Sequence, residues 1–396
     1  MILCDRPDPE TSTSETIMKH TNRRNRRGLT LAETAVTTAT ATAGIAILTV
    51  TLGAGLGERT GFRSAANLFV LGQAHHAYAM DWMGRQWTVV PDELDEYDGN
   101  VVWYNSEVRC LDSIILGNDA GGLLWGYWVG GGTCSGIPGD TGYWNGIGTS
   151  IFPPYDLNNM VEFSGSRLIY NARGFRDYVS DNTEDPAFFQ PGTLDARLAK
   201  AAFDEDVEFI GPYHPRLTGM MVLQPGYSLP ASAMWGIDIH RAASAGGWQD
   251  PRDTTGGYAS PSVDQCLHPD LKTRMIERWW IDGAPGRFNP AFGGGFDGQV
   301  NTGSRPGRHW MFNQGHEARS QALFFDGSIA TVRTGDAYED DLQYQKTSGG
   351  DGLWSRDTPM GADGLYGSLG VDDFTSFHVL TTDGIRGRDF LSREDG

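Results

Sequence analysis

The chain has 396 residues, of which 31 are Lys or Arg and 50 are Asp or Glu, so its formal net charge at pH 7 is −19. This surplus of acid argues against nucleic acid as a partner, because nucleic-acid binding needs basic surface. The length is sufficient for one large or two smaller domains behind an N-terminal segment.

The N-terminal region combines a basic segment with a long uncharged stretch. Residues 1–28 end in Arg26-Arg27-Gly28, and the 24 residues from Thr34 to Gly57 carry no charge. As a helix, this stretch would cover about 36 Å, more than the bilayer core of about 30 Å. The preceding arginines predict a cytoplasmic N-terminus and place the chain after Glu58 outside. Many threonine, alanine and glycine residues in the stretch favour close association of helices.

The Gly28-Leu29 junction, the arginines before it and Glu33, five positions after Gly28, resemble the prepilin leader of type IV pilins and type II secretion pseudopilins. The resemblance implies cleavage after Gly28 and methylation of the Leu29 amine by a prepilin peptidase at the inner membrane. Phenylalanine is usual in this family where Leu29 stands here. A carboxylate at the end of a membrane helix needs a partner, and the Leu29 amine of a neighbouring subunit would suit Glu33. Alternatively, Glu33 reaches lipid headgroups in a simple signal anchor.

Two further features of the N-terminal half bear on its organisation. Met18 begins a compact basic leader, so translation starts at either Met1 or Met18. A helical period from Thr60 to Gln86 predicts one long helix, whose 29–57 half spans the membrane and whose amphipathic 58–90 half lies on a globular domain. The predicted buried sector contains Ala65, Leu68, Leu71, Gly72, His75, Ala79 and Trp82. The adjacent His75 and His76 cannot share a helix face, so core packing or partial exposure is expected for both rather than metal binding.

A second resemblance links this helix to the C-terminal half. Residues 67–78 are similar to the Asn-Leu-x-x-Leu-Gly-x-Ala…Tyr segment of a large group of prepilin-like proteins common in planctomycetes. That group also carries His, nine residues, then Asp-Gly, which His316, Asp326 and Gly327 supply. Read from the residues alone, β-prone runs flank Asp326-Gly327 and predict a hairpin with a two-residue turn. A bracing role for His316 is favoured over a metal or catalytic role with Asp326.

Residues 91–396 predict an extracytoplasmic, β-rich domain rich in glycine and tryptophan. The expected fold class is α+β and pilin-like, with the long N-terminal helix packed on a largely antiparallel sheet. The hairpin occupies 316–332, and an acidic, glycine-rich tail follows from Arg333. Further predicted elements are strands at 100–104, 219–223, 233–239 and 374–380 and a short helix at 195–204.

The cysteine residues predict a disulfide, and two acidic runs are candidate calcium sites. Cys110 and Cys134 lie in a segment bound for an oxidising compartment and predict a disulfide, while Cys266 is either buried or paired with one of them. The acidic runs 204–206 and 339–341 could hold calcium, which pseudopilins sometimes bind in C-terminal loops, although solvated acid is the default. Asp238 and His240 would share a strand face, either as a ligand pair or as a hydrogen-bonded structural pair. No other cofactor is expected.

Common catalytic motifs are absent from the sequence: it has no Gly-x-Ser-x-Gly, His-Glu-x-x-His or phosphate loop, so an enzyme is not expected. The predicted function is a structural pilin- or pseudopilin-like subunit of a type II secretion-like or type IV pilus-like assembly. It would sit in the inner membrane as a single-pass protein, with its C-terminal domain periplasmic or at the cell surface. The alternative is a membrane-anchored cell-surface protein that binds polysaccharide, since sugar rings stack on aromatic faces. The candidates for that stacking are Trp125, Trp128, Trp144, Trp279 and Trp280.

Overall fold

A computed structural model describes residues 56–88, 115–128, 145–148, 170–211, 214–215, 223, 225–251, 253–277, 319–354, 365–368, 372–375 and 381–393. All of them belong to one compact unit, Thr51–Gly396. The helices in this part are α2 (Leu56–Asp81), α4 (Arg173–Arg176), α5 (Leu194–Asp204) and α6 (Thr334–Thr347). None of them is both long enough and apolar enough to cross a membrane. The predicted span lies outside the described residues, except for its last two positions.

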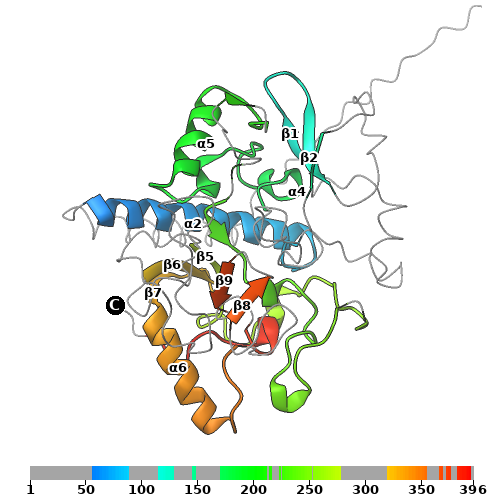
Figure 1. Ribbon diagram of the computed structural model, residues 1–396, viewed down its shortest axis with the longest axis vertical. Coiled ribbons are helices and arrows are strands. Elements are labelled where there is room, and N and C mark those ends of the chain that lie inside the picture. The colour runs from blue at the N-terminus through cyan, green and yellow to red at the C-terminus, as the bar shows by residue number, and fades with distance from the viewer. Residues whose placement is uncertain are drawn as a thin grey trace, which may run out of the picture. The chain divides into compact units, whose positions relative to one another are not determined.

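The described strands form three sheets (Figure 1). The largest has the order β4-β5-β6-β7 and is antiparallel throughout. A second sheet, β1-β2-β3, pairs β1 with β2 antiparallel and β2 with β3 parallel, and β8 and β9 form an antiparallel pair. The predicted α+β class with mainly antiparallel sheets is therefore confirmed. The strands are β1 (Ile115–Asn118), β2 (Leu124–Trp128), β3 (Asn145–Gly148), β4 (Tyr227–Ser228), β5 (Thr273–Glu277), β6 (Arg319–Phe324), β7 (Ile329–Arg333), β8 (Leu365–Ser368) and β9 (Asp372–Thr375).

Helix α2 packs against β6 and β7 through the apolar sector that the helical period predicts. Leu68, Leu71 and His75 are fully buried. A Cβ atom on Gly72 would lie 3.3 Å from the side chain of Leu323, so glycine lets the helix and the sheet approach closely. The contact is a continuous apolar core, and burial of its side chains is what holds α2 in place.

A buried polar cluster adds a second attachment between α2 and the sheet. The Ser64 hydroxyl donates a hydrogen bond to Glu277 Oε1 and lies 3.0 Å from the Tyr227 hydroxyl. Glu277 Oε2 accepts from the Gln321 amide at 2.7 Å. Because these groups come from α2, β4, β5 and β6, the cluster fixes the register of the helix along the sheet as well as its orientation.

The sequence predicts a helix that is too long at its C-terminal end. Helix α2 ends at Asp81, and the Gly84 amide closes it by donating to Ala79 O at 2.6 Å. Met83 takes φ 53° in this closing turn, which is the left-handed conformation typical of a helix terminator. Trp82 is consequently 52% exposed rather than buried as predicted. The Gln86 amide then bonds to Pro261 O at 2.8 Å, a partner distant in sequence that the helical period cannot reveal.

Two local predictions are confirmed and one is wrong. The helix expected at 195–204 is α5, capped by Thr193, whose Oγ1 accepts from the Ala196 amide at 3.1 Å. The hairpin is formed by β6 and β7. The strand expected at 233–239 is instead a short 3-10 helix, Ala231–Ala233, followed by turns. A Cβ atom on Gly236 would meet Gly256 O at 2.3 Å, so this backbone packs tightly against another loop instead of pairing in a sheet.

The segment after Arg333 is folded wherever the structure describes it. It forms α6, β8 and β9, and its Phe390 is 3% exposed. Strand β9 overlaps the start of the strand predicted at 374–380, and residues 376–380 lie outside the described residues. The remaining short 3-10 helices are Pro186–Phe188, Ala243–Ala245, Val263–Gln265 and Gly384–Arg386.

Candidate functional site

The Asp326-Gly327 signature has a structural role in the hairpin. The Phe324 amide donates to Ser328 O at 2.9 Å and the Gly327 amide donates to Phe324 O at 3.0 Å, which defines a three-residue loop rather than the predicted two-residue turn. Gly327 has φ 85°, the left-handed conformation that a three-residue hairpin loop needs. Asp326 Oδ1 accepts from the Ser328 amide at 2.8 Å. Backbone geometry therefore accounts for both residues, while His316 lies outside the described residues.

Gly327→Ala is expected to lower the free energy of unfolding by about 1–2 kcal/mol, because an L-residue is strained in the left-handed region. Steric clash would not contribute, since the nearest atom to the new Cβ is His76 Nε2 at 3.8 Å. Gly61→Ala, inside α2 with similar free space, is the matched control and should stabilise the protein by up to about 1 kcal/mol. Urea unfolding measures both variants. Equal effects of the same sign would refute the assignment of Gly327 to a conformational role.

The C-terminal segment 381–393 contacts both this hairpin and the neighbouring strand β5. Asp389 and Lys272 form an ion pair with 3.3 Å between Oδ1 and Nζ, and both side chains are at most 1% exposed. The Thr381 hydroxyl and the Thr273 amide also donate to Asp389, at 2.6 and 2.8 Å. Arg393 lies 4.2 Å above the ring of Phe324 and reinforces the same attachment. The cluster is fully buried and hydrogen-bonded, which indicates a structural role.

Three further side chains, Arg274, His75 and Cys266, have pKa values that burial shifts. Arg274 donates to Gln86 Oε1 at 3.2 Å, and burial lowers its pKa to about 10, so it remains charged at neutral pH. Burial, with Arg274 close by, holds the pKa of His75 well below its usual value, so His75 is neutral. Burial also raises the pKa of Cys266 to about 11, which leaves a protonated and weakly nucleophilic thiol.

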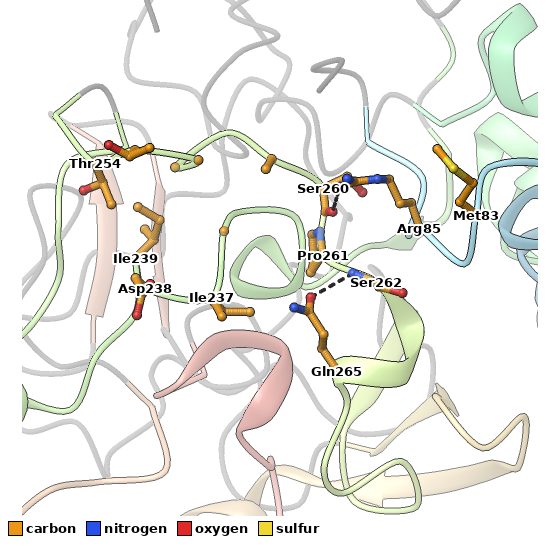
Figure 2. Close-up of a pocket in the computed structure, with 15 residues that line it drawn as sticks. Met83, Arg85, Ile237, Asp238, Ile239, Thr254, Ser260, Pro261, Ser262 and Gln265 are labelled. Atoms are coloured by element: carbon orange, nitrogen blue, oxygen red, sulfur yellow. Dashed lines mark hydrogen bonds between the residues drawn. The ribbon is translucent and has the colours of Figure 1, made fainter. Parts of the chain in front are cut away.

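An open cavity of about 390 Å³ lies where the C-terminal turn of α2 meets two loops, 236–239 and 254–265 (Figure 2). Arg85 donates through Nη1 to Ser260 O at 2.7 Å, and the Ser262 amide donates to Gln265 Oε1 at 2.9 Å. Among the side chains that line the cavity, Asp238 is the sole acid and Arg85 the sole base. Together with the serine and threonine residues of the lining, these groups can hydrogen-bond a polar ligand.

Met83 is an unusual residue at the edge of this cavity. It is 86% exposed and has φ 53°. Met83→Gly is therefore expected to raise the free energy of unfolding by about 0.5–1 kcal/mol, because glycine relieves the strain and little buried surface is lost. Ala66→Gly, at an exposed position inside α2, is the control and should cost about 1 kcal/mol. Thermal unfolding measures both variants. If Met83→Gly destabilises the protein, the Met83 side chain makes packing contacts that its 86% exposure does not reveal.

Several predicted site residues lie outside the described part of the chain: Gly28, Leu29, Glu33, Cys110, Cys134 and His316. Cys266 is a free thiol, so the pairing considered for it is not formed. Asp238 is exposed and His240 is buried against Trp235, with 5.5 Å between ring centroids, so they are neither a ligand pair nor a hydrogen-bonded pair. The chain turns over residues 236–239, where the Ile239 amide donates to Gly236 O at 3.1 Å, so no strand places the two side chains on one face.

The structure also bears on the predicted sugar-stacking tryptophans and on the candidate calcium sites, where it describes their residues. Trp125 is 4% exposed and donates to Asp119 Oδ2 at 2.8 Å, so it offers no sugar-stacking face. The side chains of Trp128, Trp144, Trp279 and Trp280 lie outside the described residues. In the run 339–341, Asp341 is buried and accepts from the Leu353 amide at 2.7 Å. No group of three or more metal-ligating side chains suited to an ion occurs among the residues with assigned positions.

The cavity was missed by reasoning from the sequence because its walls come from segments about 150 residues apart that carry no shared motif. Only the Met83-Gly84 pair, a plausible helix stop, gave a local signal for its edge. Comparisons with protein-family models, with curated proteins and with solved structures give no match.

Proposed function

We propose that this protein is a structural pilin- or pseudopilin-like subunit, processed by a prepilin peptidase after Gly28 and assembled through its N-terminal helix. The assembly would be a type II secretion-like or type IV pilus-like fibre that starts at the inner membrane. Glu33 would pair with the Leu29 amine of a neighbouring subunit. Charge asymmetry around the uncharged stretch 34–57 and the leader resemblance support this proposal.

One structural observation carries the proposal furthest: the outward face of α2 bears an exposed seam with coiled-coil spacing. Its members alternate at intervals of four and three residues, which is the periodicity of helix–helix contacts. Two of its five members are alanine, and at those positions another helix can approach closely. Val70 and Met80 are 42% and 76% exposed despite being apolar. The seam consists of Ala66, Val70, Gln73, Ala77 and Met80.

Helix α2 begins, in the sequence, at the end of the stretch that is proposed to span the membrane. The helix starts at Leu56, inside the uncharged stretch, and its other faces are packed against β6, β7 and the 3-10 helix Pro186–Phe188. A helix attached to its own domain on one side and open on the other can contact neighbours without unfolding that domain. The exposed seam therefore leaves a strip of α2 open to neighbouring subunits of the proposed fibre.

Glu33→Ala is expected to reduce the filament-incorporated fraction about tenfold, since loss of one charge pair of about 1.4 kcal/mol changes an equilibrium constant by that factor. Ala77→Arg, in the exposed seam, should also reduce incorporation without changing the unfolding midpoint. Glu339→Ala, at an exposed position on α6, is the control and should leave incorporation unchanged. Shearing of cells followed by immunoblotting gives the incorporated fraction.

N-terminal mass mapping of the membrane-extracted protein tests the processing step directly. The expected N-terminus is methylated Leu29. A chain that begins at Met1 or Met18, or one that has lost the uncharged stretch and begins near Gly61, would refute the proposal.

A further inference from the structure

The cavity in Figure 2 is a pre-formed feature held by contacts between distant segments. The Val263 amide donates to Gly84 O at 2.8 Å and the Gly236 amide donates to Gly257 O at 3.0 Å, so all three walls are cross-linked. A Cβ atom on Gly257 would lie 2.3 Å from Pro251 O, which shows how closely the loops pack behind the cavity. A ligand would therefore meet polar groups whose positions are already fixed, and little ordering would be needed on binding.

The polar groups of the lining are mixed and nearly balanced in charge. The Asp238 side chain is 61% exposed, and its contact with Arg241 at 3.7 Å is a weak surface pair. Gln265 uses Oε1 to accept from the Ser262 amide, and its nitrogen lies on the side of Ile237 (Figure 2). Arg85 is engaged with Ser260 O. The cavity thus presents a carboxylate acceptor and an amide donor beside the apolar side chains of Ile237 and Met83.

From this lining we infer that the cavity binds one or two sugar units of a neutral polysaccharide. Planar carboxylate and amide groups suit the adjacent hydroxyls of a sugar ring, and Ile237 can cover its C–H face, while Met83, at the opposite end of the lining in Figure 2, can cover that of a second unit. An acidic polymer is disfavoured by the net charge of −19. An extended peptide is disfavoured as well, because turns and a 3-10 helix form the loop walls and no named strand supplies a lining residue.

The conformation of Met83 gives independent support for a ligand at this position. Its backbone is in the left-handed region although its side chain is almost fully exposed, so glycine would be the more stable choice. Strain that is retained without a packing benefit is typical of a residue kept for contact with a ligand. This inference goes beyond the proposed assembly role and does not depend on it, since the cavity is formed by one chain.

The test uses the purified full-length protein in detergent, first on an array of neutral and acidic oligosaccharides and then by calorimetry with the neutral oligosaccharide retained best. Asp238→Asn and Gln265→Ala are each expected to weaken binding about tenfold, the factor for loss of one hydrogen bond to a charged or fixed polar group. Asp270→Asn makes the same charge change at an exposed position outside the cavity and should bind like the parent protein.

Met83→Gly provides a second arm that separates folding from binding. It should melt at a higher temperature than the parent and yet bind the oligosaccharide several-fold more weakly. The inference is overturned if no neutral oligosaccharide binds, if acidic glycans or peptides bind better, or if Asp238→Asn and Asp270→Asn bind equally well. None of these readouts requires membrane assembly, so their failure is distinguishable from failure of the fibre proposal.

Discussion

Asp389→Ala is expected to lower the free energy of unfolding by about 3–5 kcal/mol, the usual cost of leaving a buried charge without its partner. Lys272 is fully buried, and burial lowers its pKa while Asp389 counteracts that shift. Removal of the carboxylate would also leave the Thr381 hydroxyl and the Thr273 amide without the acceptor they use at 2.6 and 2.8 Å. Urea unfolding followed by circular dichroism measures the loss.

An exposed ion pair in the same protein supplies the control. Lys200 and Asp204 approach to 2.7 Å, but their side chains are 63% and 57% exposed. Asp204→Ala should therefore change stability by no more than about 0.5 kcal/mol. The double variant Lys272→Met with Asp389→Leu should be less destabilised than Asp389→Ala, because it leaves no charge behind. A loss below about 1 kcal/mol for Asp389→Ala would mean that solvent reaches Lys272.

The second large effect is acid destabilisation through two buried histidines. Burial, with Lys272 as a smaller cause, lowers the pKa of His240 to about 3, and burial, with Arg274 next, lowers that of His75 well below 6.5. The native state then binds fewer protons than the unfolded state, whose histidines titrate near 6.5. The stability they contribute is complete above pH 6.5 and is lost as the pH falls, at about 1.4 kcal/mol per pH unit for each histidine.

Glu184 acts in the opposite direction. It is 1% exposed, and burial, reinforced by nearby Asp195, raises its pKa to about 8. Its native state holds a proton that the unfolded state releases above pH 4.5, so its contribution is lost as the pH rises toward 8. For these three groups alone, the sum places maximal stability near pH 6.5, with a net loss of about 1.4 kcal/mol per pH unit on either side.

Urea titrations from pH 4.5 to 8 measure this profile. His75→Leu should flatten the acidic side by about one proton without affecting the basic side, and Glu184→Gln should flatten only the basic side. Each variant is thus the control for the other. If His75→Leu shifts the whole profile while keeping the parental slope, His75 already titrates near its unfolded pKa.

The sequence predicts those parts of the fold that local signals determine. Thr193 and the apolar residues after it define α5, and Gly327 defines the hairpin within a few neighbouring residues. The buried face of α2 follows from its helical period. The residue at which α2 ends does not follow from that period, because Arg85 and Gln86 pair with a loop near residue 260 instead of continuing the helix. The false strand at 233–239 has the same origin, since close packing of Gly236 against Gly256 overrides its β-prone composition.

The candidate sites differ in the same way. Gly28, Leu29 and Glu33 could be named from the sequence because the proposed processing would depend on a short linear motif. The cavity could not, because Asp238 and Gln265 are meaningful only when their loops meet beside the end of α2. Trp125 shows the converse error: its glycine-rich surroundings suggested an exposed loop, but its indole is buried and bonded to Asp119.

The pairing of Lys272 with Asp389 also constrains how the chain matures. The two residues are 117 positions apart, and the second lies close to the C-terminus. During synthesis, β5 emerges long before the carboxylate that neutralises its neighbouring lysine, so the buried ammonium group of Lys272 has no anionic partner until residue 389 has emerged. A nascent fragment stalled before residue 389 should therefore be degraded rather than accumulate as a stable domain.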